Sequence, residues 1–156
     1  MTAMAPEPAR PPEQRKADSL AKLAQEGADV WVATASEAGE AHLVPLSLAW
    51  DGDRVILATE RRSRTLANLQ RSGRARLAMG PERDVVMIDA VLVSVIDADD
   101  VPHGLGDLYA SQADWDPRQA PDGLAYVVLA PERIQAWREA NEIAGRTLMR
   151  HGKWLV

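Results

Sequence analysis

Short β-rich runs separated by tight-turn signals constrain the fold of this chain more than any other feature of its sequence. Residues 30–35 and 41–50 are rich in apolar and β-branched side chains, and Gly39 lies in the short segment between them. A third run, residues 54–59, follows Gly52, which is flanked by two aspartates. Runs of this length joined by a few turn residues are typical of antiparallel hairpins. We therefore expect an antiparallel meander rather than strands alternating with crossover helices.

The rest of the chain adds helices and further strands to this meander. Helices are predicted at residues 13–26, 63–72 and 104–111, and strands at residues 75–79, 84–97, 125–130 and 133–138. The Val and Ile content of residues 84–97 favours a strand, with a bend near Asp89 and Ala90. The first helix has a narrow apolar stripe formed by Ala17, Leu20, Leu23 and Ala24. The order predicts a mainly β (α+β) fold, an antiparallel split β-barrel with short flanking helices.

Length and composition bound the domain organisation. A chain of 156 residues with 46% hydrophobic residues is expected to form one domain. We expect a disordered tail at residues 1–12, the barrel at 13–139, and a segment at 140–156 that is either a mobile tail or an arm on a partner subunit. The net charge of −5 argues against nucleic acid as a partner, and no run reaches membrane-spanning length. Because no signal-peptide pattern occurs, we expect a cytoplasmic protein.

An unusual group of positive charges lies where the third strand leads into the second helix. Arg61, Arg62 and Arg64 surround Ser63, which is a good N-cap residue. A helix N-terminus carries a partial positive charge, so it repels arginines unless an anion lies among them. Free backbone N–H groups, guanidinium groups and the hydroxyls of Ser63 and Thr65 together would hold a phosphate. We therefore predict an anion site here; the alternative is a capped helix whose arginines point into solvent.

No catalytic or metal-binding motif accompanies this anion site. The chain has no Cys, and His42, His103 and His151 are far apart in the sequence, so we expect no metal site and structural roles for these histidines. Gly-x-Ser-x-Gly, Walker and dinucleotide-binding patterns are also absent. A phosphate site on an antiparallel barrel without an acid–base set indicates a protein that holds a cofactor, and that the cofactor carries the chemistry.

Two segments resemble those of the pyridoxamine 5′-phosphate oxidase-like split barrels. The run that starts Leu57-Ala-Thr-Glu-Arg-Arg-Ser-Arg-Thr-Leu is similar to their flavin-phosphate segment. The run Gly39-Glu-Ala-His-Leu-Val-Pro-Leu-Ser is similar to the strand whose backbone contacts the isoalloxazine ring. The resemblance extends from about residue 20 to residue 137. Thr65 stands where many members have Lys, and the ending Gly-Lys-Trp-Leu-Val replaces Arg-Leu-x-Pro, which argues against oxidation of vitamin B6.

The resemblance implies a homodimer with two cofactor sites at the subunit interface, and either coenzyme F420 (a deazaflavin) or FMN as cofactor. Ser63 and Arg64 would hold the phosphate, and Ala58 and Thr59 would line the ribityl chain or the ring. The other implied cofactor-binding residues are Val44, Pro45, Leu46 and Ser47 at the ring edge, together with Arg61, Arg62, Thr65 and Asn68. The oligoglutamate tail of F420 would need a basic track, for which the candidates are Lys16, Lys22, Arg71, Arg74 and Arg76.

The leading functional hypothesis is an oxidoreductase in which the bound cofactor exchanges a hydride with a small conjugated substrate. No residue is assigned as a general acid or base. A non-catalytic carrier or sensor of the same cofactor is the first alternative. A haem-handling split barrel is the second, and it would require an axial histidine in a basic pocket.

Overall fold

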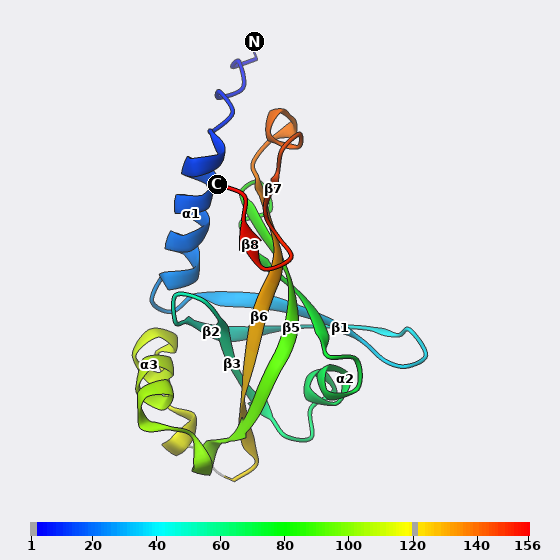
Figure 1. Cartoon of the computed structure of the whole chain (residues 1–156), viewed down its shortest axis with the longest axis vertical. Coiled ribbons are helices and arrows are strands. Elements are labelled where there is room, and N and C mark those ends of the chain that lie inside the picture. Colours follow the sequence, from blue (N-terminus) through cyan, green and yellow to red (C-terminus); the bar gives the residue numbers. More distant parts are fainter. Residues whose placement is uncertain (1–2, 120–121) are drawn as a thin grey trace.

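The strands and helices of the computed structural model follow the order expected of a meander (Figure 1). The structure describes residues 3–119 and 122–156. Its main elements are α1 (Pro12–Ala24), β1 (Asp29–Ala35), β2 (Ala41–Trp50), β3 (Val55–Glu60), α2 (Arg64–Ser72), β4 (Arg74–Met79), β5 (Val85–Asp97), α3 (His103–Ala113), β6 (Leu124–Trp137), β7 (Thr147–Arg150) and β8 (Lys153–Trp154). Short 3₁₀ turns occur at Ala98–Asp100, Pro117–Gln119 and Ala140–Glu142. No helix within the described residues is long and apolar enough to cross a membrane.

The sheet closes on itself through strand β3. Its strand order is β3-β2-β1-β4-β5-β6-β7-β8, and β3 also pairs with β6, so β1 to β6 form a closed antiparallel barrel. The predicted class, a mainly β antiparallel split barrel with flanking helices, is confirmed. β3 pairs with β2 only opposite Leu48 to Trp50, but it pairs with β6 along its whole length. Within the described residues, the first part of β2, from Ala41 to Ser47, therefore has β1 as its strand partner and a free edge on its other side.

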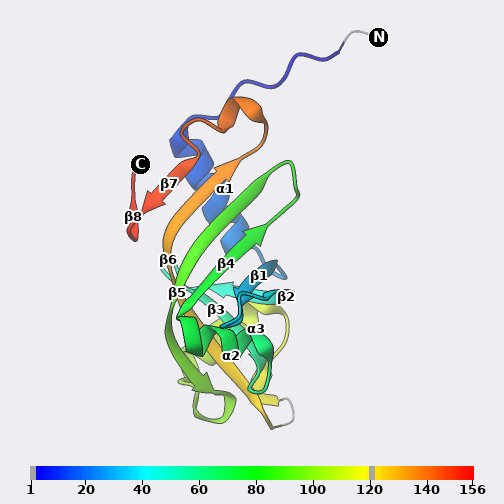
Figure 2. The same cartoon turned by 90° about the vertical axis from the view of Figure 1, so that its right-hand side faces the viewer.

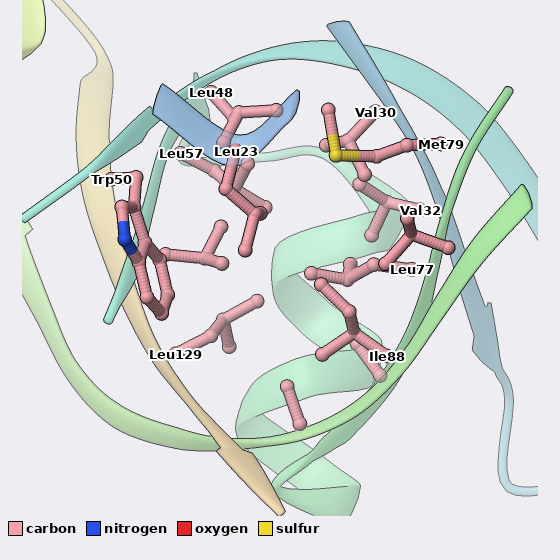
Figure 3. Packing of buried hydrophobic residues seen from close by; sticks show 14 of the residues in the cluster. Leu23, Val30, Val32, Leu48, Trp50, Leu57, Leu77, Met79, Ile88 and Leu129 are labelled. Atoms are coloured by element: carbon pink, nitrogen blue, oxygen red, sulfur yellow. The ribbon is translucent and has the colours of Figure 1, made fainter. Parts of the chain in front are cut away.

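The barrel interior is filled by aliphatic side chains, and helices cover its ends. Figure 3 shows Leu23 of α1 among the side chains of the barrel strands, with the α2 ribbon beside the same cluster. Leu66 and Leu69 of α2 belong to this cluster as well. Of the predicted apolar stripe on α1, Leu23 is fully buried, but Ala17 and Ala24 are exposed. Arg15 and Ser19 are buried in their place, so the predicted stripe is wrong at half of its positions.

A second, smaller cluster lies outside the barrel under α3. Tyr109 of α3 and Tyr126 of β6 meet edge to face with ring centroids 5.5 Å apart, and both are fully buried. Gln112 joins this helix to the rest of the core, because its Nε2 donates to the carbonyl oxygen of Leu23 at 2.6 Å. The amide of Trp50 donates to the Gln112 Oε1 at 2.9 Å. α3 therefore fixes both the end of β2 and the end of α1.

Strand β6 corrects the prediction of two separate strands at residues 125–130 and 133–138. It runs without a break from Leu124 to Trp137 and includes Pro131. Asp89 pairs with Arg133 and Ala90 pairs with Pro131, which leaves Glu132 as one extra residue on β6. The extra residue lets a strand continue past a proline, which cannot donate to the ladder. The Glu132 carbonyl accepts a hydrogen bond from Gly152 at 2.9 Å. The same irregularity lies at the bend predicted near Asp89 and Ala90.

The C-terminal segment folds back on its own chain rather than forming a mobile tail. β7 pairs with β6, and β8 pairs with β7. His151 and Gly152 connect the last two strands, and both have positive φ, 53° and 74°. A two-residue hairpin turn requires such angles, for which Asn-Gly is the usual signal. The position of residues 140–156 at a dimer interface stays a prediction.

An ion-pair network joins the N-terminal segment to the C-terminal half of the chain. The Glu142 carboxylate accepts hydrogen bonds at 2.8–2.9 Å from the backbone and guanidinium of Arg10 and from the backbone of Arg138. Asp18 accepts from another nitrogen of Arg10 at 2.8 Å. Residues 3–11 have no helix or strand, yet Arg10 is anchored by these contacts. Met1 and Thr2 lie outside the described residues, and disorder of the 1–12 segment stays a prediction.

Replacement of Glu142 by Gln should destabilise the fold in a pH-dependent manner. The hydrogen bonds from Arg10 lower the pKa of Glu142 from 4.5 to about 2, although burial opposes this shift. The folded-state pKa is below the unfolded value, so the stabilisation is present above about pH 4.5 and is lost as the pH falls towards 2. We expect Glu142→Gln to lower the free energy of unfolding at pH 7 by about 3 kcal/mol, measured by urea denaturation, with a much smaller effect near pH 2.

The exposed Glu139 provides the matched control, because its pairing with Arg83 at 3.6 Å is solvent-accessible. Glu139→Gln should change stability by less than about 0.5 kcal/mol. Equal effects of the two substitutions at pH 7 would contradict the assigned role of Glu142.

Candidate functional site

The turn from β3 into α2 is held by the side chain of Ser63. Ser63 is the N-cap of α2, and its Oγ accepts from the Leu66 amide at 3.1 Å. Thr59 at the end of β3 donates its hydroxyl to the same oxygen at 3.3 Å. The N–H groups of Arg64 and Thr65 are the first of the helix, so they have no acceptor within it and face outward from the helix end. The Ser63 hydroxyl proton is a further donor at this end. Gly73 ends the helix in the left-handed conformation, with φ 71°.

The three arginines of the predicted anion site differ in their surroundings. Arg61 forms an ion pair with Asp97, and its amide donates to the Gly123 carbonyl at 2.8 Å. Arg61 and Arg62 line a pocket of about 550 Å³, whose other lining residues are Glu60, Asp122, Gly123 and Leu124. Arg64 is exposed, lies outside that lining and has no ion-pair partner among the described residues. Two of the three arginines therefore line a pocket, and the third lies at the open helix end.

Several predicted cofactor-binding side chains are turned into the protein. Ala58 and Thr65 are 4% and 2% exposed, and Ala58 packs in the cluster under α3. The side chains of these two residues are therefore not available to a ligand. Asn68 is partly buried, and its Nδ2 donates to the Thr34 hydroxyl at 3.1 Å. This contact joins α2 to β1.

The residues predicted at the ring edge lie on the free edge of β2. Val44 and Leu46 point inward and pack against the barrel core, whereas Pro45 is exposed on the outer face. Ser47 donates its hydroxyl to Asp29 at 3.2 Å, and its carbonyl accepts from the Tyr109 hydroxyl at 3.1 Å. Because β3 joins β2 only from Leu48 onward, Pro45 lies where β2 has a free edge.

A second pocket, of about 590 Å³, lies at the other end of α2, and we call it the arginine pocket. Its charged lining residues are Arg71, Arg74, Arg76, Asp89, Glu132, Arg133, Arg150 and His151. Arg71, Arg74 and Arg76 of the proposed basic track meet here. Lys16 and Lys22 do not join them: Lys16 lies over the Trp154 ring, and Lys22 bonds to backbone oxygens of Gly80 and Asp84.

Sequence reasoning did not identify Arg133, Arg150 and His151 as members of this pocket. Their positions are 57 or more residues from Arg76, so only the folded topology shows the proximity. His151 is in the pocket, whereas His42 and His103 are not among its lining residues. Within the described residues, no group of three or more His, Cys, Asp or Glu could hold a metal ion.

The family to which this chain belongs follows from a match to a family model. The family model described as pyridoxamine 5′-phosphate oxidase matches residues 19–138, which is most of the barrel. The chain belongs to the pyridoxamine 5′-phosphate oxidase-like family. The resemblance expected from the β2 and β3–α2 segments is therefore confirmed. No curated protein matches the chain significantly.

The solved structures that are similar to this chain include proteins named for different cofactors. An F420 reductase has a TM-score of 0.58 and 15% identity, and covers 73% of this chain and 94% of its own. An FMN-binding protein from Nostoc punctiforme has a TM-score of 0.51 and 11% identity, with coverages of 80% and 79%. A haem-binding protein from Mycobacterium smegmatis has a TM-score of 0.61 and 17% identity, with coverages of 92% and 59%. At these identities the structures show the shared fold alone.

Removal of the Ser63 hydroxyl should destabilise the start of α2. Ser63→Ala removes the N-cap acceptor of the Leu66 amide, and we expect a loss of about 1 kcal/mol in the free energy of unfolding, measured by urea denaturation. Ser63→Thr keeps the hydroxyl and should restore most of that stability. Ser111→Ala, at an exposed position of α3, is the control and should not destabilise the protein. A destabilised Ser63→Thr variant together with an unaffected Ser63→Ala variant would contradict the cap assignment.

Proposed function

We propose that this chain is an oxidoreductase that binds coenzyme F420 or FMN at the start of α2 and beside the free edge of β2. The observation that carries the proposal is the placement of three arginines at a helix N-terminus in a member of this family. An F420 reductase and an FMN-binding protein among the structural neighbours support it. The bound cofactor would supply hydride transfer to or from a small conjugated substrate.

The residues around the β3–α2 turn fit the phosphate of such a cofactor. The Ser63 hydroxyl, the amides of Arg64 and Thr65, and the Arg64 guanidinium are donors at one helix end. Arg62 directly precedes Ser63 and lines the pocket that Arg61 also lines. Arg61 contributes less, because Asp97 already neutralises its charge. The role of these side chains is to bind and orient the cofactor, which agrees with the absence of an obvious acid–base set in the sequence.

The free edge of β2 fits the ring portion of the cofactor. Backbone N–H and C=O groups between Ala41 and Ser47 that face away from β1 have no strand partner among the described residues. Buried backbone groups need partners, so an occupant that covers this edge must hydrogen-bond to it. A heterocycle with amide-like edges satisfies that requirement.

A homodimer that covers the outer face of β1 and β2 is part of the proposal. Trp31 and Leu43 are 49% and 59% exposed, and Trp31 lies directly opposite the exposed Pro45 across the strand pair. Adjacent exposed apolar side chains beside an unpaired strand edge are typical of a protein–protein interface. A second copy would bury this face and exclude water from the cofactor.

Haem binding is a second candidate function, and one observation favours it. His151 lies in the arginine pocket, which supplies the histidine and the positive charges that this alternative requires. Arginines would pair with the haem propionates, and His151 would be the iron ligand. A haem-binding protein among the structural neighbours supports this candidate.

The cofactor proposal predicts that Arg64→Ala weakens cofactor binding by about tenfold. The substitution removes one charged hydrogen bond to the phosphate while the exposed position leaves the fold intact. Titration of the purified protein with FMN and with F420, followed by fluorescence, measures the change. The cofactor with higher affinity should also raise the melting temperature more, because binding to the native state stabilises by RT ln(1 + [L]/Kd).

Arg54→Ala is the matched control, since Arg54 lies at the opposite end of β3, beside the β2–β3 turn. It should leave the affinity unchanged. Equal affinities of wild type, Arg64→Ala and Arg54→Ala would overturn the site assignment. Reoxidation of the reduced cofactor by a substrate panel then separates an enzyme from a carrier.

The dimer proposal predicts that Leu43→Glu converts a two-chain assembly to a single chain. A carboxylate placed in a desolvated interface is strongly unfavourable, whereas Leu43 is already exposed in the single chain, so the monomer should still fold. Light scattering after size-exclusion chromatography gives the molar mass. Met4→Glu, which changes a 93% exposed residue in the N-terminal segment, should leave the assembly intact. A monomeric wild type would contradict the proposal.

A further inference from the structure

The arginine pocket brings together charges from five separate elements of the fold, α2, β4, β5, β6 and β7. Arg71 comes from the end of α2, Arg74 and Arg76 from β4, Arg133 from β6, and Arg150 from the end of β7. Figure 2 shows α2 beside the start of β4, with β5 and β6 running alongside. Arg74 and Arg76 share one face of their strand because side chains alternate along a strand. The pocket therefore results from the barrel topology rather than from a local run of charge.

The pocket carries a surplus of positive charge in an acidic protein. Five arginines face two carboxylates, Asp89 and Glu132, whereas the whole chain has a net charge of −5. Asp89 accepts from both Arg76 and Arg133 at 2.7 Å. Partial burial would raise the pKa of Asp89, but its hydrogen bonds and charge interactions with these two arginines hold the pKa below its usual range. Asp89 is thus an ionised group that fixes two guanidinium groups in place.

The remaining arginines are not neutralised to the same degree. Arg74 is 3.4 Å from Glu132, and both side chains are largely exposed, so this ion pair is weak. Arg150 has no ion-pair partner among the described residues. Arg71 donates to the Ala35 carbonyl at 2.6 Å, which keeps its charge at the pocket without cancelling it. Five arginines against two carboxylates therefore leave a surplus of three positive charges around the pocket.

Small side chains also line the pocket. Ala33, Ala35, Ala75 and Ala90 contribute lining beside the charged groups. Such a lining accepts a flat or compact carbon body, and the guanidinium groups accept anions. Because Asp89 already holds the side chains of Arg76 and Arg133 in place, these side chains lose less conformational entropy when a ligand binds.

We infer that the arginine pocket binds a small ligand that carries two or more carboxylate or phosphate groups. This site is separate from the β3–α2 turn, because the two lie at opposite ends of α2. The same chemistry is present in free tricarboxylates, in pyrophosphate and in the propionates of haem.

Titration calorimetry with citrate, pyrophosphate and haemin tests the inference on the full chain. We expect saturable binding of at least one of them, which weakens when NaCl is raised from about 0.1 M to about 1 M. Arg74→Gln and Arg150→Gln should each weaken it about three- to tenfold, and the double variant further. Arg83→Gln, an 85% exposed arginine outside the pocket, should have no effect. Both pocket arginines are on the surface, so the variants should fold, which circular dichroism verifies.

The arms of the experiment identify the source of the anionic groups. A Soret shift that is lost in His151→Ala assigns the pocket to haem, whereas citrate or pyrophosphate binding that is unchanged in this variant assigns it to a free small anion. Binding of none of the probes, or equal binding by wild type and the double variant, overturns the inference. Titration with FMN, which has no oligoglutamate tail, separates the two sites. Arg74→Gln with Arg150→Gln should leave FMN affinity unchanged, and Arg64→Ala should leave citrate or pyrophosphate affinity unchanged.

Discussion

The double pairing of β3 is the constraint on which the rest of this structure depends. β3 pairs with β6 along its whole length, but it pairs with β2 at only three residues. This arrangement closes the barrel and at the same time leaves the first seven residues of β2 with a free edge. It also delivers the end of β3 to the start of β6, where Arg61 bonds to Gly123. One pairing choice therefore produces both the closed core and the two features of the proposed cofactor site.

Local signals in the sequence predicted most of the barrel. The errors occur where the structure depends on contacts between residues that are distant in the sequence. The strands of the first meander and the α2 boundaries at Ser63 and Gly73 follow from periodicity, an N-cap and a C-terminal glycine. β6 could not be predicted as one strand, since Pro131 normally interrupts a ladder and the extra residue Glu132 is visible only in the register with β5. The final hairpin was missed because His151 takes a positive φ that the sequence does not signal.

The same distinction between local and nonlocal information applies to the candidate site. The arginines at the start of α2 were identifiable because they are neighbours in the sequence. Side-chain burial was not, and it removes the Thr65 hydroxyl and the Ala58 side chain from the groups that can contact a ligand. The basic track was predicted from charge alone, and the structure divides it because Lys16 and Lys22 pack near the C-terminal hairpin and the β4–β5 turn. A charge has a predictable sign, but its position depends on partners that are distant in the sequence.

Because of the helix dipole, arginines at the two ends of α2 are not equally strong evidence for a bound anion. At the C-terminal end, the partial negative charge of the helix favours Arg71, so this arginine requires no ligand to be stable there. At the N-terminal end the dipole opposes Arg62 and Arg64, and neither has an ion-pair partner among the described residues. Cations at the N-terminus do not stabilise a surface helix unless an anion binds beside them. The N-terminal arginines are therefore stronger support for a bound anion than their small number suggests, whereas the arginine pocket depends on Arg74 and Arg150, which the dipole does not explain.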